Sequence, residues 1–479
     1  MMTKTTGNYW GLWLGGACLL ITILVPPPTP ELSTTAWLTT GLAIMMAVWW
    51  VTETVPVAVT ALVPLTAAPL LNILPIKAVA SLYTHPLIFL FLGGFLLSLA
   101  MEKCNLHRRI ALATMTVVGA NPRMQVGGLM LVTAFLSMWM SNTATAVMML
   151  PIALSVIELL KVDHDVSELS PALLLGIAYS ASIGGVATLI GTPPNALLAA
   201  YLSDTYQIEI GFGQWMLFAL PMCCLMLLAA WYWLTRSGLE GSGSAQTHAL
   251  FQQQLQQLGP LHRHEKRVLI IFVGAATGWI LRVPLAQWTG LPISDTTIAM
   301  VAATLLFIIP SSKKTANGQA ERLLDWPTTQ KLPWGVLLLF GGGLALAGMI
   351  KSSGLAQFIG ASIGQAGSGQ LWLLILVVTA AIVFLTEVTS NTATTAGFLP
   401  LLGPVAVSLG YAPQSIVIPA ALAASCAFMM PVATPPNAIV FASGELRIKQ
   451  MALKGLMLNF VATALITAAS VWLLPLLFN

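Results

Sequence analysis

The heptapeptide TSNTATT occupies residues 389–395, inside one of the most apolar parts of the chain. Nearly the same string, MSNTATA, occurs at residues 140–146, again in apolar surroundings. Small hydroxyl and amide side chains are costly to place in such surroundings unless they find polar partners. A chain that carries this polar string twice is predicted to consist of two related halves.

The composition is that of a membrane protein. Of the 479 residues, 57% are hydrophobic and only 8% are charged, whereas soluble proteins carry about 25% charged residues. The net charge of +4 provides no concentrated basic surface, so no nucleic-acid partner is predicted. The five cysteines show neither metal-ligand spacing nor a disulfide framework. We therefore expect a polytopic protein in contact with membrane lipid, without a cofactor.

Turn and charge signals divide the chain into thirteen apolar segments, most of them long enough to cross a hydrocarbon core about 30 Å thick. Two of them, 126–160 and 369–408, are too long for one span and carry the heptapeptides near the middle. Each is predicted to form a re-entrant hairpin, which enters and leaves on the same side of the membrane. The remaining eleven are predicted transmembrane helices, near 9–26, 36–52, 56–75, 86–102, 171–202, 213–235, 267–282, 292–310, 334–350, 413–442 and 455–477. The fold class expected is therefore all-α.

Basic residues set the expected orientation, because Lys and Arg collect on the cytoplasmic side. With the N-terminus inside and each hairpin returning to its own side, 17 of the 20 Lys and Arg residues lie in the cytoplasm. Only Lys77, Arg282 and Lys351 then lie outside. We expect an integral protein of a bacterial inner membrane, with the N-terminus cytoplasmic and the C-terminus outside. Segment 9–26 lacks a cleavage site and is predicted to be a span, not a removed signal.

Three pairs of motifs occur in the same order in both halves. FLGGFLLSLAMEK (91–103) matches LFGGGLALAGMIK (339–351), SMWMSNTATAVMMLP (137–151) matches TEVTSNTATTAGFLP (386–400), and GTPPNALL (191–198) matches ATPPNAIV (433–440). In the layout above, the first hairpin opens inward and the second outward. The halves are therefore predicted to be inverted repeats, an arrangement typical of secondary transporters that bind substrate at the repeat interface.

The predicted organisation has two repeats and a linker. Residues 1–235 form the first inverted repeat and residues 267–479 the second. The intervening residues 236–266 are polar and rich in Gly, Ser and Gln, as expected of a cytoplasmic linker, with a short amphipathic helix predicted at 248–258.

Paired prolines are expected to break one segment in each repeat. A proline cannot continue a helix, because it lacks an N–H group and clashes with the preceding turn. Segment 171–202 should therefore break near Pro193–Pro194, and segment 413–442 near Pro435–Pro436. Non-helical backbone at membrane depth is tolerated only where protein or water satisfies it. Each break also points the positive N-terminal end of a half-helix toward the centre, where an anion is favoured.

The hairpin tips and helix breaks together supply two kinds of site. Sodium is a hard cation and requires several oxygen ligands. The candidate sodium ligands are Ser137, Ser141, Asn142 and the Gly191 carbonyl in the first half, and Thr386, Ser390, Asn391 and the Ala433 carbonyl in the second. A carboxylate substrate instead requires donors, and the candidates are Asn142, Thr143, Thr192, Asn391, Thr392 and Thr434. No Lys or Arg lies in either motif, so bound sodium would offset the substrate's charge and couple the two.

Two features allow more than one interpretation. Small polar residues in membrane helices often serve only helix packing, although duplication of both motifs in order argues against that here. Glu387 lies three residues before Ser390, and an ionisable residue within a membrane segment is a functional candidate. It is predicted to orient the hairpin tip or to carry a proton, and we favour orientation.

The combined motifs resemble the divalent anion/sodium symporter (DASS) family, whose members transport dicarboxylates, citrate and sulfate. Paired Ser-Asn-Thr hairpins, each followed by a helix broken at Pro-Pro-Asn, carry the resemblance along essentially the whole chain. The stretch SCAFMMPVATPPNAIV (425–440) is similar to the family's signature.

The resemblance implies a homodimer in which a mobile part of each protomer moves like an elevator against a scaffold. It implies the same two sodium sites as above, with substrate carboxylates on the Asn-Thr pairs of both hairpins and on the Thr-Pro pairs of the broken helices, which adds Pro435. The implied activity is sodium-coupled import of C4 dicarboxylates such as succinate, malate or fumarate.

Other functions remain as alternatives. Within transport, these are a sodium-independent dicarboxylate or anion exchanger and a sodium-coupled sulfate or citrate symporter. An intramembrane enzyme would need a nucleophile–base pair or metal ligands, and the sequence shows neither a Ser/His pair nor HExxH. An anion channel is disfavoured by duplicated oxygen-rich motifs without basic residues. We therefore expect a transporter and not an enzyme.

Overall fold

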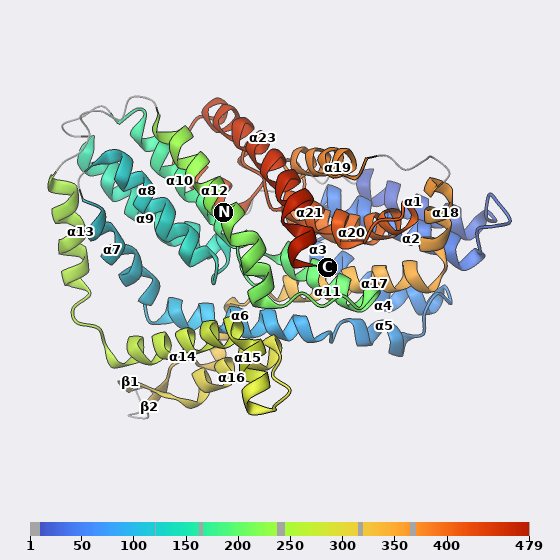
Figure 1. The fold of residues 1–479 in the computed structure, drawn as a ribbon, viewed down its shortest axis with the longest axis horizontal. Helices are drawn as coiled ribbons and strands as arrows, with labels where there is room; N and C mark the ends of the chain where they lie inside the picture. Colours follow the sequence, from blue (N-terminus) through green and yellow to red (C-terminus); the bar gives the residue numbers. More distant parts are fainter. Residues whose placement is uncertain are drawn as a thin grey trace.

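The computed structural model describes residues 10–119, 121–161, 166–236, 245–314, 320–364 and 370–478. Within these residues the chain is almost entirely helical, with one two-stranded antiparallel sheet between β1 and β2. In Figure 1, α7 to α9 and α13 lie toward one end of the long axis and α1, α2 and α18 toward the other, with α11, α20 and α21 between them.

The elements of the first half follow the predicted apolar segments closely. They are α1 (Trp10–Leu24), α2 (Thr34–Thr52), α3 (Val57–Thr60), α4 (Val63–Leu70), α5 (Ile76–Leu82), α6 (Pro86–Lys103), α7 (Leu106–Val118), α8 (Pro122–Ser137), α9 (Asn142–Leu160), α10 (Leu169–Val186), α11 (Pro193–Tyr206) and α12 (Phe212–Thr235).

The remaining elements run from the linker to the end of the second half. They are α13 (Ala245–Gln257), α14 (Arg263–Ile280), α15 (Arg282–Thr289), α16 (Asp295–Ile308), β1 (Pro310–Lys314), β2 (Ala320–Arg322), the 3₁₀ helix η1 (Trp326–Lys331), α17 (Trp334–Ser352), α18 (Leu355–Gly364), α19 (Leu371–Leu385), α20 (Asn391–Ser408), α21 (Gln414–Ala424), α22 (Pro435–Phe441), α23 (Ile448–Trp472) and α24 (Leu474–Leu477).

Seven helices in the described part of the chain are long and apolar enough to cross a membrane. An eighth would be added if the bent pair of α14 and α15, which meet at 84°, formed one span. Large exposed apolar side chains, among them Leu24, Leu70 and Trp472, lie on the outer surface, as expected where lipid replaces water. The polytopic membrane fold predicted from composition is therefore confirmed.

Both segments that carry a heptapeptide are pairs of helices separated by a short break. Helix α8 ends at Ser137 and α9 begins at Asn142. Helix α19 ends at Leu385 and α20 begins at Asn391. Each Ser-Asn-Thr string therefore lies where the break ends and the second helix of its pair begins.

Both proline-containing segments are broken where the sequence predicts. Helix α10 ends at Val186 and α11 begins at Pro193, and α21 ends at Ala424 and α22 begins at Pro435. All residues of α10, and all but one residue of α21, are buried. Protein therefore surrounds these two helices, as non-helical backbone at membrane depth requires.

The two halves of the chain contact each other beside these breaks. Helix α10 packs on α8 and α9, and α21 packs on α19 and α20, so each broken segment lies against its own helix pair. Helix α22 also packs on α9 and α10, while α11 packs on α20 and α21. The second part of each broken segment thus contacts the opposite half, and this places both sets of motifs at one location.

One sequence prediction requires correction. Segment 56–75 was expected to be one span, but it forms the short helices α3 and α4, because Pro56, Pro64 and Pro69 interrupt its hydrogen bonding. The linker 236–266 contains the amphipathic helix that the sequence predicts. Its predicted helix forms as α13, which packs on α7 and α9 and buries Phe251 completely. Residues 237–244 of the predicted linker lie outside the described residues.

Candidate functional site

The Ser-Asn-Thr strings form the N-terminal ends of α9 and α20. Ser141 is the N-cap of α9, and its hydroxyl accepts a hydrogen bond from the Ala144 amide at 3.2 Å. Ser390 is the N-cap of α20, without a side-chain cap bond. Serine is a favoured N-cap because its oxygen can satisfy an amide that the helix leaves unpaired. The local sequence thus explains why a helix starts at each Asn.

The Thr-Pro-Pro-Asn strings begin α11 and α22 in the same way. Thr192 and Thr434 are the N-caps, and the prolines occupy the first helical positions. Proline suits these positions because the amide it lacks would have no partner inside the helix. The Thr434 hydroxyl accepts a hydrogen bond from the Asn437 amide at 3.3 Å. Four helices therefore begin at the four motifs.

All four helix starts line a single cavity of about 870 Å³. Its lining includes every predicted substrate-binding residue, namely Asn142, Thr143, Thr192, Asn391, Thr392, Thr434 and Pro435. Of the predicted sodium ligands outside that set, Ser141, Gly191, Ser390 and Ala433 also line it. Ser137 and Thr386 lie behind the wall, fully buried.

Three of these helices are long enough to present a substantial positive end to the cavity. Helices α9, α11 and α20 have 19, 14 and 18 residues. The aligned peptide dipoles make this end electropositive. In α9 and α20 the first amide groups also have no acceptor within the helix, whereas α11 begins with two prolines that lack an amide hydrogen. The cavity is therefore suited to an anion even though the motifs contain no basic side chain.

The Asn142 amide lies at the centre of a cluster of oxygens in the first half. Its terminal atom faces Ser137 Oγ at 2.7 Å, the Ala181 carbonyl at 3.1 Å and the Gly191 carbonyl at 3.2 Å. With the amide nitrogen turned toward these atoms, all three are acceptors within hydrogen-bond reach of its N–H groups. With the amide oxygen turned toward them, four oxygen atoms lie close together, and a bound cation would offset their mutual repulsion.

The second half repeats this arrangement. The Thr386 hydroxyl lies 2.8 Å from Asn391 Oδ1 and 3.0 Å from the Ala424 carbonyl, and it can donate its hydrogen to either acceptor. In the first half, the Ser137 hydroxyl contacts Asn142 Oδ1 at 2.7 Å and the Ala181 carbonyl at 2.6 Å. Each group in the first half thus has a counterpart in the second. Ser137 corresponds to Thr386, Asn142 to Asn391, and the Ala181 carbonyl to the Ala424 carbonyl.

The Asn of each Thr-Pro-Pro-Asn string closes the helix break, a role the sequence prediction missed. Asn195 Nδ2 donates to the carbonyls of Val186 at 3.0 Å and Thr188 at 2.8 Å. Asn437 Nδ2 donates to the carbonyls of Ala427 at 3.2 Å and Met430 at 3.0 Å. Both Asn side chains are fully buried. Their identical place in the duplicated string was the signal that could have revealed this role.

Glu387 is buried and bonded entirely to donors. Its two carboxylate oxygens accept hydrogen bonds of 2.8 to 3.1 Å from the backbone amides of Phe428, Met429 and Met430. Asn459 Nδ2 on α23 donates to Oε1 at 2.7 Å. An ionised carboxylate is an acceptor only, and this geometry fits it. The contacts connect the break between α19 and α20 to the break between α21 and α22, as expected of an orienting residue.

The wall of the cavity facing the motifs includes residues of α2, α6, η1 and α17, which lie outside the predicted substrate and sodium sites. The charged residues among its described lining are Glu53 and Lys331. Glu53 is exposed at the end of α2, and Lys331 lies just before α17, where its amine is 3.4 Å from Glu102. Their distance in sequence from the motifs left no local signal of a shared cavity.

This geometry can be compared with known proteins. The sequence profile of the sodium:sulfate symporter transmembrane region matches residues 6–478. The chain belongs to this symporter family. That result confirms the resemblance to divalent anion/sodium symporters and the prediction of a transporter and not an enzyme.

Curated relatives cover nearly the whole chain. A sodium-dependent dicarboxylate transporter, SdcS, of Staphylococcus saprophyticus is 38% identical over 480 residues, covering 98% of this chain and 92% of that protein. The SdcS transporter of Staphylococcus aureus strain MRSA252 is 40% identical over 491 residues, covering 99% of this chain and 93% of that protein.

Solved structures show a related fold at much lower sequence identity. The YdaH transporter of Alcanivorax borkumensis has a TM-score of 0.58 and 13% identity, covering 92% of this chain and 98% of that one. MtrF of Neisseria gonorrhoeae has a TM-score of 0.57 and 13% identity, covering 97% and 96%. At this identity the likeness concerns the fold alone.

Proposed function

We propose that the protein imports C4 dicarboxylates such as succinate, malate or fumarate, coupled to sodium. The observation that carries this proposal is the convergence of both Ser-Asn-Thr strings and both Thr-Pro-Pro-Asn strings on one cavity of about 870 Å³. The naming of relatives at 38% and 40% identity as sodium-dependent dicarboxylate transporters supports dicarboxylate over sulfate or citrate.

Two sodium ions would bind in the two oxygen clusters. The first site consists of Ser137, Ser141, Asn142 and the Gly191 carbonyl, and the second of Thr386, Ser390, Asn391 and the Ala433 carbonyl. The three oxygens around the Asn142 terminal atom, at 2.7 to 3.2 Å, support the first site. The matching contacts of Thr386 support the second. Unwound carbonyls beside half-helix ends are common sodium ligands in transporters.

The dianion would bind between the two clusters. One carboxylate would contact Asn142, Thr143 and Thr192, and the other Asn391, Thr392, Thr434 and Pro435. A sodium ion bound to Asn142 Oδ1 fixes the amide so that its nitrogen points away from the cluster. That nitrogen is then available to the substrate, and the same holds for Asn391. Ion binding therefore prepares the donors that the carboxylates need, which couples the two.

The finer architecture proposed follows from the duplicated motifs and the family resemblance. Residues 1–235 and 267–479 would be inverted repeats, with about 11 transmembrane helices and re-entrant hairpins at 126–160 and 369–408. The hairpins and broken helices would move as one body, like an elevator, within a homodimer in a bacterial inner membrane. The N-terminus would be cytoplasmic and the C-terminus outside, which reporter fusions at both ends would test.

The experiment is uptake of radiolabelled succinate into proteoliposomes with an inward sodium gradient, or with potassium in its place. Uptake that requires sodium and is lost in Asn142→Ala and Asn391→Ala is the expected result. Uptake that requires preloaded dicarboxylate and is indifferent to sodium would instead identify an exchanger. Sulfate and citrate, tested as substrates in the same vesicles, would identify the other symporter if succinate is not taken up.

A further inference from the structure

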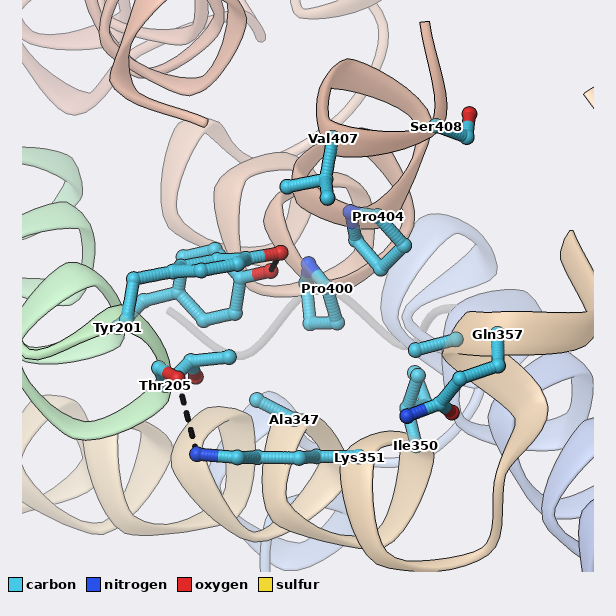
Figure 2. A pocket seen from close by; sticks show the side chains of 12 residues that line it. Tyr201, Thr205, Ala347, Ile350, Lys351, Gln357, Pro400, Pro404, Val407 and Ser408 are labelled. Atoms are coloured by element: carbon cyan, nitrogen blue, oxygen red, sulfur yellow. Dashed lines mark hydrogen bonds between the residues drawn. The ribbon is translucent and has the colours of Figure 1, made fainter. Parts of the chain in front are cut away.

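A second cavity, of about 540 Å³, lies between α11, α17, α18 and α20 (Figure 2). Its lining includes Tyr201 and Thr205 in the C-terminal half of α11, and Pro400 and Pro404 in α20. The first residues of the same two helices line the motif cavity described above. The two cavities are therefore at opposite ends of α11 and α20.

A layer of mainly apolar side chains lies between the two cavities along α11 and α20. It surrounds a void of about 10 Å³ lined by Leu197, Leu344, Ala396 and Leu399, among others. Along α11, residue 193 lines the motif cavity, residue 197 the void and residue 201 the second cavity. Along α20, residues 392, 396 and 400 line the same three spaces in the same order. These steps of four residues follow one helix face. The three spaces thus lie in a row along the same helices.

The second cavity is mainly apolar but contains groups that suit a carboxylate. The Lys351 amine donates to the Thr205 carbonyl at 2.9 Å, as Figure 2 shows. Lys351 is exposed, and no ion pair neutralises it among the described residues. The Thr205 hydroxyl is buried without a hydrogen-bond partner in that part of the chain. The Tyr201 and Tyr206 hydroxyls, 3.4 Å apart, lie on the same wall.

Helix α17 runs from the motif cavity to the second cavity. It has 19 residues, so it is about 28 Å long, close to the thickness of a hydrocarbon core. Lys331, just before its start, lines the motif cavity, and Lys351, near its end, lines the second cavity. Among the described residues, each cavity is therefore lined by one lysine, and the two lie at opposite ends of one membrane-spanning helix. The distribution of basic residues predicts that Lys351 is on the outer side.

We propose that the second cavity is an outer vestibule that captures the dicarboxylate before it reaches the motif site. Lys351 attracts the dianion, and the Thr205 and tyrosine hydroxyls supply donors beside it. This inference rests on the proposed dicarboxylate transport and adds a second, weaker binding site for the same substrate. The layer around Leu197 and Leu344 separates this site from the motif cavity until the helices move.

The test is the initial rate of succinate uptake by intact cells of a bacterial host that lacks its own dicarboxylate uptake. The variants are Lys351→Gln, Lys351→Glu and Lys351→Arg, with Lys77→Gln as the control. Lys77 is exposed on α5, is also predicted to face outward, and lines neither cavity. Rates are normalised to the protein present in the membrane, so that a variant that folds poorly is recognised.

The expected result is a change in KM with an unchanged maximal rate. Removing one charge near a dianion should raise KM about threefold in Lys351→Gln, and reversing it about tenfold in Lys351→Glu. Lys351→Arg and Lys77→Gln should retain the KM of the unaltered protein. The differences should shrink when choline chloride is added at constant sodium, because salt screens exposed charges.

Two results would overturn the vestibule. One is a KM in Lys351→Gln and Lys351→Glu that matches Lys77→Gln while the unaltered protein takes up succinate normally. The other is a lower maximal rate at unchanged KM, which would make Lys351 a packing residue for α11. Absence of succinate uptake by the unaltered protein is a separate outcome, since it would reject the proposed function and the vestibule with it.

Discussion

The two halves of the site use the same oxygen cluster but secure it differently. In the first half, the Thr188 hydroxyl donates to the Met138 carbonyl and so connects the break between α8 and α9 to the break between α10 and α11. In the second half, the equivalent connection is the Glu387 carboxylate, which accepts from the backbone amides of residues 428–430. The Thr188 hydroxyl and the Glu387 carboxylate thus make equivalent connections in the two halves.

The use of a hydroxyl in one half and a carboxylate in the other follows from the different lengths of the two helix breaks. Residues 187–192 separate α10 from α11, whereas residues 425–434 separate α21 from α22. A longer break has more amide groups without helical partners. A carboxylate can accept several hydrogen bonds at once, whereas a hydroxyl donates only one. The second half therefore contains a fixed acidic group beside its oxygen cluster that the first half lacks.

The largest expected effect comes from removing these two connections. Glu387→Ala leaves three backbone amides and Asn459 without an acceptor, and should lower the free energy of unfolding by about 3–5 kcal/mol. Thr188→Val leaves the Met138 carbonyl without its donor and the Gly191 amide without its acceptor, and should cost about 1–2 kcal/mol. Thermal unfolding of the purified variants in one detergent would rank them. Equal destabilisation by the two substitutions would contradict the difference between the halves.

A second test concerns the space beside each Asn. A Cβ atom on Gly185 would collide with the Asn142 amide, while the equivalent position in the second half is already Ala427. Displacing a packed group in this way costs about 1–3 kcal/mol, so Gly185→Ala should reduce uptake at low sodium about tenfold or more. The control Ala427→Gly should stay within about twofold of the unaltered protein, since deleting one methyl group is a small perturbation. A similar loss of uptake in both variants would show that the difference between Gly185 and Ala427 does not affect transport.

The smallest effect is expected when the buried hydroxyl residue of one half is replaced by that of the other. Thr386→Ser keeps the hydroxyl that contacts Asn391, so the sodium concentration for half-maximal uptake should change by less than about twofold. Ser137→Thr adds a methyl group at a fully buried position, where overpacking typically costs about 1–3 kcal/mol. The sodium dependence of uptake in both variants would sharpen the comparison. A larger shift in Thr386→Ser than in Ser137→Thr would count against equivalent clusters.

Much of this site can be predicted from the sequence, because the motifs act locally. A Ser N-cap and a Pro-Pro pair both favour the start of a helix, so the helix starts that follow Ser141 and Thr192 result from short-range chemistry. The prediction that Glu387 orients the hairpin tip fits its observed contacts. These features depend on a few neighbouring residues or on a duplication visible in the chain.

The remaining features depend on contacts between distant segments. Thr188 has no duplicate, since Met430 occupies its place in the second half, and a lone threonine gives no signal of its partner. Lys331 and Lys351 reach the two cavities only because α17 packs beside α11 and α20. The interruption of segment 56–75 was missed because its apolar composition outweighed its prolines in the prediction.

The most direct test of the central claim is equilibrium binding of radiolabelled succinate to the purified protein, titrated with sodium at constant ionic strength. The claim is that ion binding in the two clusters holds the amide nitrogens of Asn142 and Asn391 toward the substrate. It predicts negligible binding without sodium, a sigmoidal rise as sodium is added, and loss of binding in Asn142→Ala and in Asn391→Ala. Succinate binding with the same affinity in the absence of sodium would contradict it.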